Sequence, residues 1–189
     1  MMTAEGRSPR ILVMGCGGIG GIIAAHLLQH SIEVHVVSRN PETLKAVKEE
    51  GFQLVGAGGK LRVPGQIHPM IPPGDFDYIL FATQPTDIES AAKQALPQLS
   101  PNGCAVVFQN GLCESRIADI LGDEDRVIGA IVAWGATMTK AGVFDQTSAG
   151  GFVLGSLTNQ AKDALDELER LLSSIGPVQR TENLLGARW

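Results

Sequence analysis

The sequence has few charged residues for its length and no excess of positive charge. Charged residues make 19% of its 189 positions, below the roughly 25% of an average soluble chain, whereas hydrophobic residues make 44%. This balance excludes an intrinsically disordered chain. Fifteen basic and 20 acidic residues give a net charge of −5, so the chain as a whole should not be drawn to nucleic acid or to an anionic membrane. Any phosphate-binding site must therefore be local.

Long apolar runs and cysteine patterns are also lacking. Runs such as Val127 to Ala136 are well short of the roughly 20 residues of a membrane helix, and the first nine residues hold no signal-peptide core. We therefore expect a cytoplasmic protein without a membrane partner. Cys16, Cys104 and Cys113 are odd in number and form no metal-ligand spacing. We expect free thiols and no structural metal.

The apolar pattern alternates between short β-rich runs and helical periodicity, which is typical of an α/β fold. We expect a doubly wound, mainly parallel sheet with added antiparallel strands. The predicted strands of the sheet are residues 10–14, 32–37, 77–83, 104–109 and 127–133. The predicted helices are residues 18–30, 41–50, 85–96, 113–121 and 161–175.

Three segments depart from simple alternation. High glycine and proline density between Phe52 and Pro73 predicts a small hairpin as a local insertion. Residues 142–146 and 151–155 are predicted to form an antiparallel pair. The last long helix is predicted to begin at a Thr158-Asn159 cap and to end at Gly176-Pro177.

A glycine-rich loop, Gly15-Cys-Gly-Gly-Ile-Gly20, lies directly between the first predicted strand and the first predicted helix. This G-x-G-x-x-G spacing in that setting is typical of dinucleotide-binding folds. Gly15 would allow the tight turn, Gly17 would let the backbone approach a pyrophosphate, and Gly20 would allow close packing of helix on strand. The helix N-terminus would attract the phosphates. The loop alone leaves S-adenosylmethionine, or a turn without any ligand, as alternatives.

The end of the second predicted strand bears on the choice of cofactor. NAD-binding folds usually place Asp or Glu there, where the carboxylate accepts a hydrogen bond from the ribose 2′-OH. Here the strand ends Val37-Ser38-Arg39-Asn40, and the first acidic residue is Glu42. The Arg39 guanidinium can hold a 2′-phosphate and stack on adenine, and the Ser38 hydroxyl adds a donor. The pattern favours NADP over NAD and over S-adenosylmethionine.

These features together resemble the ketopantoate reductase (2-dehydropantoate 2-reductase) family, whose N-terminal domain is a Rossmann-type fold. Arg39 matches the family's 2′-phosphate arginine, Gln109-Asn110-Gly111 is similar to its (H/Q)-N-G turn, and Ala136 matches an alanine beside the nicotinamide ribose. The resemblance implies that residues 1–180 are the NADP-binding domain of an oxidoreductase. Such an enzyme reduces a 2-keto acid to a 2-hydroxy acid in pantothenate biosynthesis.

The resemblance and the loop together give a set of candidate site residues. Asn110 is expected to contact both the nicotinamide ribose and the substrate. The predicted cofactor-binding residues are Gly15, Cys16, Gly17, Gly18, Ile19, Gly20, Ser38, Arg39, Thr83, Gln84, Asn110, Gly111 and Ala136.

The final residues, Glu182 to Trp189, resemble the start of the helix that leads in the family to its catalytic Lys. The resemblance implies that this Lys lies beyond Trp189, together with a helical second domain that would supply a homodimer contact. Residues 181–189 are then the start of a linker helix, and no catalytic residue is expected within the chain. We expect the chain alone to bind cofactor without reducing substrate.

One departure from the family pattern keeps other functions open. Thr83-Gln84-Pro85 follows the third core strand, where the family usually has a Lys that contacts the cofactor. Gln84 can form a hydrogen bond but carries no charge, so the substrate stays undetermined. The alternatives are a non-catalytic module that binds or senses NADP(H) and another dehydrogenase with the same N-terminal fold.

Overall fold

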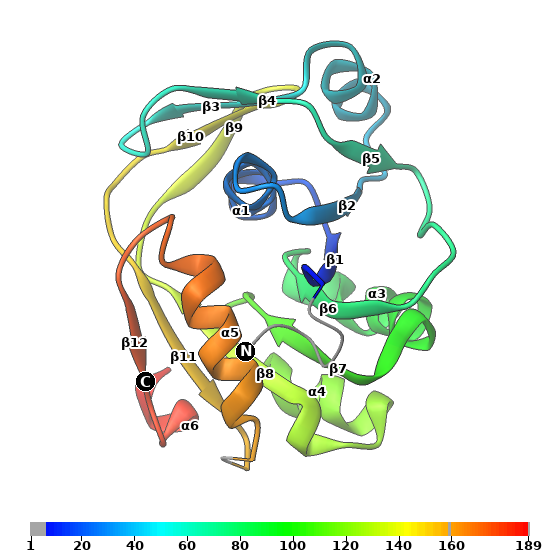
Figure 1. Ribbon diagram of the computed structural model, residues 1–189, viewed down its shortest axis with the longest axis vertical. Helices are drawn as coiled ribbons and strands as arrows, with labels where there is room; N and C mark the ends of the chain where they lie inside the picture. Colours follow the sequence, from blue (N-terminus) through cyan, green and yellow to red (C-terminus); the bar gives the residue numbers. More distant parts are fainter. Residues whose placement is uncertain (1–6, 159, 189) are drawn as a thin grey trace.

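The computed structural model describes residues 7–158 and 160–188, which form two β-sheets and the helices that cover them (Figure 1). The larger, eight-stranded sheet contains β1 (Arg10–Met14), β2 (Glu33–Val37), β5 (Gln66–His68), β6 (Phe76–Phe81), β7 (Leu99–Val107), β8 (Val127–Val132), β11 (Phe152–Ser156) and β12 (Val178–Arg180). The smaller, four-stranded sheet contains β3 (Phe52–Gly56), β4 (Leu61–Val63), β9 (Ala136–Lys140) and β10 (Val143–Gln146).

The larger sheet has the order β12-β11-β8-β7-β6-β1-β2-β5, and the smaller has the order β4-β3-β10-β9. In the larger sheet the described neighbours pair in parallel, except that β8 and β11 are antiparallel. This is the α/β fold with a mainly parallel sheet and added antiparallel strands that the sequence predicts.

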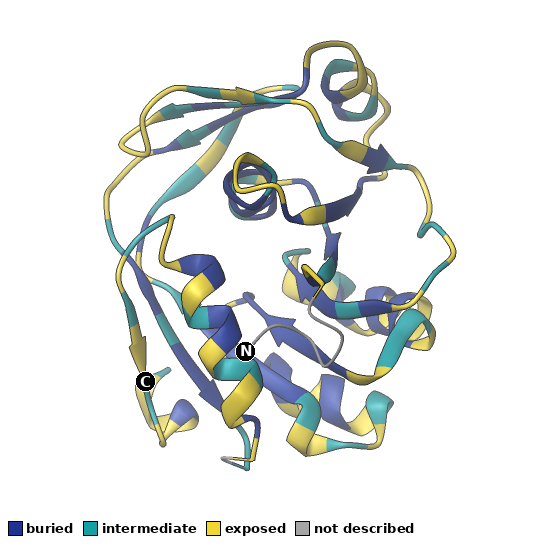
Figure 2. Ribbon diagram, viewed as in Figure 1, coloured by how far each residue is buried: buried dark blue, intermediate teal, exposed yellow. Residues whose placement is uncertain are grey.

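Helices cover both faces of the larger sheet. The helices are α1 (Gly18–Gln29), α2 (Pro41–Glu50), α3 (Ile88–Ala95), α4 (Cys113–Leu121), α5 (Lys162–Leu172) and α6 (Leu184–Ala187). Short 3₁₀ turns are η1 (Pro85–Asp87), η2 (Leu96–Gln98) and η3 (Glu124–Arg126). The core on one face includes residues of α1, α5 and the smaller sheet, and the core on the other face includes residues of α3 and α4. Figure 2 shows the buried central strands between these layers.

Strand β1 lies in the middle of this arrangement and contributes to both cores. Ile11 and Val13 belong to the core under α1, whereas Leu12 and Met14 belong to the core under α3 and α4. A parallel strand covered on both faces needs apolar residues at every position, since successive side chains point to opposite faces. The continuous apolar run of residues 11–14 therefore places β1 at the centre and its following loop at the carboxyl edge of the sheet.

The entry and exit of α2 follow local chemistry. The Asn40 side chain accepts hydrogen bonds from the backbone N–H groups of Glu42 and Thr43, at 2.9 and 3.1 Å. Pro41 occupies the first turn, where its missing N–H costs no hydrogen bond. Gly51 ends the helix with a φ of +78°, which favours glycine. The predicted helix over residues 41–50 is confirmed.

The predicted antiparallel pairing of residues 142–146 with 151–155 is wrong. β10 pairs with β9 and with β3 in the smaller sheet, whereas β11 pairs with β8 and β12 in the larger sheet. The sequence analysis missed β9, whose tight turn at Ala141-Gly142 brings it back along β10; Gly142 has a φ of +75°. The hairpin predicted between Phe52 and Pro73 is confirmed as the antiparallel pair β3 and β4.

The beginning of α5 also differs from its prediction. The helix begins at Lys162. Ala161 is its N-cap residue, and among the described residues no side-chain hydrogen bond caps this end of the helix. Thr158 instead donates a hydrogen bond of 2.5 Å from Oγ1 to Asp125 Oδ1, and Asn159 lies outside the described residues. Within residues 7–158 and 160–188, none of the helices has the length and apolar character needed to cross a membrane.

Candidate functional site

The glycine loop connects β1 to α1, and two of its glycines are required by the fold. Gly15 has a φ of +104°, and a Cβ there would lie 2.8 Å from the carbonyl oxygen of Ala82 on the neighbouring chain segment. A Cβ at Gly20 would lie 2.1 Å from the carbonyl oxygen of Gly15. The tight turn and the close approach of α1 therefore both depend on these residues, as the G-x-G-x-x-G pattern predicts.

Gly17 differs, because the described structure gives no packing reason for glycine there. Apart from Gly17 itself and its two chain neighbours, no described heavy atom lies within 4 Å of the position that its Cβ would occupy. Its φ of −87° and ψ of −166° are extended values open to any residue. Gly17 is also the N-cap residue of α1, where the first N–H groups of the helix lack intrahelical partners. The backbone here faces open space at the positive end of a 12-residue helix.

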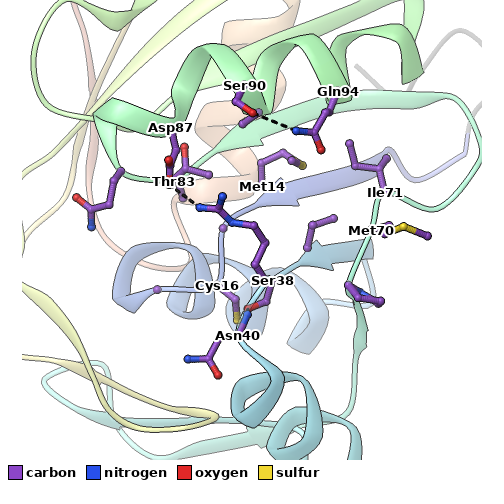
Figure 3. A pocket seen from close by; sticks show the side chains of 18 residues that line it. Met14, Cys16, Ser38, Asn40, Met70, Ile71, Thr83, Asp87, Ser90 and Gln94 are labelled. Carbon is purple, nitrogen blue, oxygen red and sulfur yellow. Dashed lines mark hydrogen bonds and ion pairs between the residues drawn. The ribbon is translucent and has the colours of Figure 1, made fainter.

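That open space belongs to a cleft of about 570 Å³ at the carboxyl ends of β1, β2 and β6 (Figure 3). Its size lies within the usual range of small-molecule sites. In the sheet order, β1 lies between β2 and β6. This is where the chain reverses direction across the sheet, and open α/β sheets bind their ligands at such a point. The cleft is lined by Met14, Gly15, Cys16, Gly17, Val37, Ser38, Arg39, Asn40, Pro69, Met70, Ile71, Ala82, Thr83, Gln84, Asp87, Ser90, Ala91 and Gln94.

The segment after β2 contributes one wall of the cleft. The backbone N–H of Ser38 donates to the carbonyl oxygen of His68 at 3.0 Å, which holds the end of β2 against β5. Ser38 Oγ accepts from the backbone N–H of Asn40 at 3.2 Å, so its own hydrogen remains available to a ligand. The Arg39 side chain is 80% exposed, and its Nη2 lies 2.6 Å from Asp87 Oδ2 on the opposite wall.

The segment after β6 forms that opposite wall. Thr83 and Gln84 follow the strand and line the cleft. Buried Gln109 donates from Nε2 to Thr83 Oγ1 at 3.1 Å, which links the end of β6 to the end of β7. Gln109 Oε1 is buried and has no hydrogen-bond partner among the described residues.

The remaining predicted site residues lie outside the cleft lining. Asn110 is exposed after β7, and Gly111 has a φ of +91°. Ala136 lies against the first turn of α1, because a Cβ on Gly18 would be 2.8 Å from the Ala136 carbonyl carbon. Ile19 and Gly20 lie in the same turn of α1. One group of candidate residues therefore lines the cleft, and the others lie outside that lining, after β7, at β9 and in the first turn of α1.

Cys16 lines the cleft as a buried, protonated thiol. Burial raises its pKa to about 12. At neutral pH the sulfur is therefore neither a nucleophile nor a ready target for oxidation.

The sequence analysis missed several residues of the cleft. Pro69, Met70 and Ile71 follow β5, whose three residues were too few to be recognised as a strand of the larger sheet. Asp87 was placed in a helix without any role. The prolines that follow β5 indicate a turn, but the position of this turn beside the cleft depends on the pairing of β5 with β2.

Comparisons with known proteins agree with this geometry. A sequence profile of the family described as ketopantoate reductase PanE/ApbA matches residues 11–159. The chain is 26% identical over 148 residues to a 2-dehydropantoate 2-reductase of Halobacterium salinarum, which covers 77% of this chain and 48% of that protein. The chain thus spans about half the length of the curated relative that it matches.

Solved structures show the same fold. A 2-dehydropantoate 2-reductase from Methylococcus capsulatus superposes with a TM-score of 0.82 at 24% identity, over 95% of this chain and 59% of that one. A ternary structure of D-mandelate dehydrogenase with NADH and anilino(oxo)acetate superposes with a TM-score of 0.85 at 19% identity, over the same shares. With a family profile that matches most of its length, the chain belongs to the ketopantoate reductase family.

Proposed function

We propose that this chain is the NADP-binding domain of an oxidoreductase that reduces a 2-keto acid to a 2-hydroxy acid, as a 2-dehydropantoate 2-reductase does. The observation that carries the proposal is Gly17. The fold leaves the space around this residue open, at the N-terminus of α1 and inside the cleft. Because Gly17 has no side chain and lies beside unpaired N–H groups at the helix N-terminus, a pyrophosphate can approach the backbone closely there.

Each part of the cofactor has residues suited to it. Arg39 and Ser38 would hold a 2′-phosphate, since one offers a guanidinium fork and the other a hydroxyl donor. Thr83 and Gln84 would contact the middle of the dinucleotide, and Asn110 would orient the nicotinamide ribose. NADPH, when bound, supplies the hydride that reduces the ketone.

The chain's own contribution is to bind and orient. The Gln109 side chain is fixed by its hydrogen bond to Thr83, so the turn that begins at Asn110 starts from a rigid point. Asn110 itself is exposed and free to face a substrate at the carboxyl end of β7. A cation that stabilises the forming alkoxide would come from outside residues 1–189, as the family resemblance implies.

A second candidate is an NAD-dependent dehydrogenase of the same fold. The observation in its favour is that Gln84 brings no charge to the cleft while Asp87 brings a carboxylate opposite Arg39. A site in which one carboxylate offsets one guanidinium attracts a phosphate less strongly than a site with an added Lys. Titration with both cofactors separates the two candidates.

The test is calorimetric titration of the chain with NADP⁺ and with NAD⁺, for the wild type and for Arg39→Asp. The wild type should bind NADP⁺ more tightly, and Arg39→Asp should reverse the order. Loss of the charge-assisted pair should cost about 1.5–3 kcal/mol, which is about 13- to 160-fold in affinity. Arg62→Asp is the matched control, because Arg62 is also exposed and paired with an acid but lies outside the cleft lining. Equal affinity of the wild type for both cofactors would refute the assignment of NADP.

A further inference from the structure

Arg39 and Asp87 form an ion pair that joins the two walls of the cleft. Arg39 Nη2 lies 2.6 Å from Asp87 Oδ2, and the two residues are 48 positions apart in the sequence. Arg39 follows β2, and Asp87 ends the η1 turn after β6. Figure 3 marks the contact with a dashed line that ends near Asp87.

The sheet order places this pair across the glycine loop. β1 lies between β2 and β6, and the loop at residues 15–17 follows β1. A bond from the β2 side to the β6 side must therefore pass over the carboxyl end of β1. A ligand whose pyrophosphate rests on the loop would meet this pair at one end of the cleft.

The pair also cancels the charge of the cleft. Among the described residues that line it, Arg39 and Asp87 are the ones with charged side chains. The guanidinium that suits a 2′-phosphate thus has a carboxylate in the position where the phosphate oxygens would bind. A phosphate placed there would meet both a competitor for the same donors and a like charge close by.

We propose that Asp87 is a specificity-determining residue. It keeps the Arg39 side chain in the ion pair when no ligand is bound, and the 2′-phosphate of NADP displaces it from Arg39. The inference rests on the proposed function, since it assigns Arg39 to that phosphate. NAD has a neutral hydroxyl in place of the phosphate, so it leaves the ion pair intact. Asp87 therefore lowers the affinity for NADP and leaves the affinity for NAD nearly unchanged. The preference for NADP over NAD becomes smaller as a result.

The test removes the charge of Asp87 and keeps its shape. Asp87→Asn should preserve the fold, because Asn is also favoured before a helix and the Asp87 side chain caps no described N–H group of α3. Glu89→Gln is the matched control. Glu89 loses the same charge two positions along the chain, is 50% exposed in an ion pair with Arg116, and does not line the cleft.

Calorimetric titration at low ionic strength should show a two- to fivefold tighter binding of NADP⁺ by Asp87→Asn, about the effect of releasing one exposed ion pair. Its binding of NAD⁺ should change by less than about twofold, and Glu89→Gln should change neither. In an Arg39→Ala background the gain from Asp87→Asn should shrink, because the competition for the guanidinium is gone.

Two results would overturn the inference while the proposed function stands. If the wild type prefers NADP⁺ and Asp87→Asn binds it more weakly, Asp87 instead orients Arg39 toward the phosphate. If Asp87→Asn behaves as Glu89→Gln does, the pair has no effect on the choice of cofactor. A wild type without preference for NADP⁺ would refute the assignment of NADP in the proposed function, and the inference with it.

Discussion

Gly17→Val should strongly weaken dinucleotide binding and leave the fold intact. The structure separates the two effects, because beyond Gly17 and its two chain neighbours no described heavy atom lies within 4 Å of its Cβ position. Its extended backbone, with a φ of −87° and a ψ of −166°, also accepts a β-branched residue. The added methyl groups would therefore project into the space where the ligand would bind and would not clash with the protein.

The expected change in stability is small because two contributions oppose each other. Removal of a glycine reduces the entropy of the unfolded chain and stabilises by about 0.4–1 kcal/mol. Loss of glycine at the N-cap of α1 costs a similar amount, since Val is disfavoured there. The melting temperature should stay within a few degrees of the wild type, at about 2–4 °C per kcal/mol for a chain of this size.

The expected change in binding is larger. Forcing extra carbon atoms into a close contact costs about 1–3 kcal/mol, which corresponds to about 5- to 160-fold in affinity. Calorimetric titration with NADP⁺, beside thermal unfolding of the same samples, measures both quantities. Gly20→Ala is the opposite control: its Cβ would lie 2.1 Å from the Gly15 carbonyl oxygen, so it should destabilise the fold itself. A folded Gly17→Val chain that binds NADP⁺ as the wild type does would refute the phosphate role of the loop.

Three other outcomes are expected. The 189-residue chain should bind NADPH but show no oxidation of it with 2-dehydropantoate, because the resemblance implies an alkoxide-stabilising Lys outside residues 1–189 and loss of one positioned donor costs about 100- to 1,000-fold; absorbance at saturating NADPH checks this. Glu114→Gln should lower the urea midpoint by the equivalent of about 3–5 kcal/mol, because it leaves the Arg188 guanidinium, only 4% exposed, without its carboxylate. Burial lowers the pKa of His26 and His68. The unfolded chain therefore gains protons below about pH 6.5 that the folded chain does not bind, so the free energy of unfolding should fall from pH 7 to pH 5 in chemical denaturation, less steeply in His26→Gln.

Local signals explain why the region from β1 to α2 could be predicted from the sequence. The apolar run at residues 11–14, the spacing of Gly15 and Gly20 and the cap at Asn40 each act over a few residues. Their physical causes are turn geometry, strand burial and hydrogen bonding at helix ends, all of which can be recognised without knowledge of distant partners.

Pairing between distant segments explains what could not be predicted. β5 has three residues, and its place beside β2 becomes apparent only from the pairing of Ile67 with Val36. The apolar alternation of β10 and β11 identifies each as a strand but not the partner of either, and they lie in different sheets. The contact of Arg39 with Asp87 likewise depends on β1 lying between β2 and β6.

In the cleft, the residues that the fold requires differ from the residues expected to determine which ligand binds. Gly15 and Gly20 are fixed by close backbone contacts, so changes there act on the fold. The N-terminus of α1 would attract the pyrophosphate of NAD and of NADP equally, because both carry that group. Under the proposed function, discrimination would depend on Arg39 and Asp87, whose side chains are 80% and 40% exposed and can change without disturbing a core. If Arg39 binds the 2′-phosphate as proposed, a protein with a net charge of −5 would hold an anionic cofactor mainly through backbone groups, and the ion pair would adjust how strongly NADP is preferred over NAD.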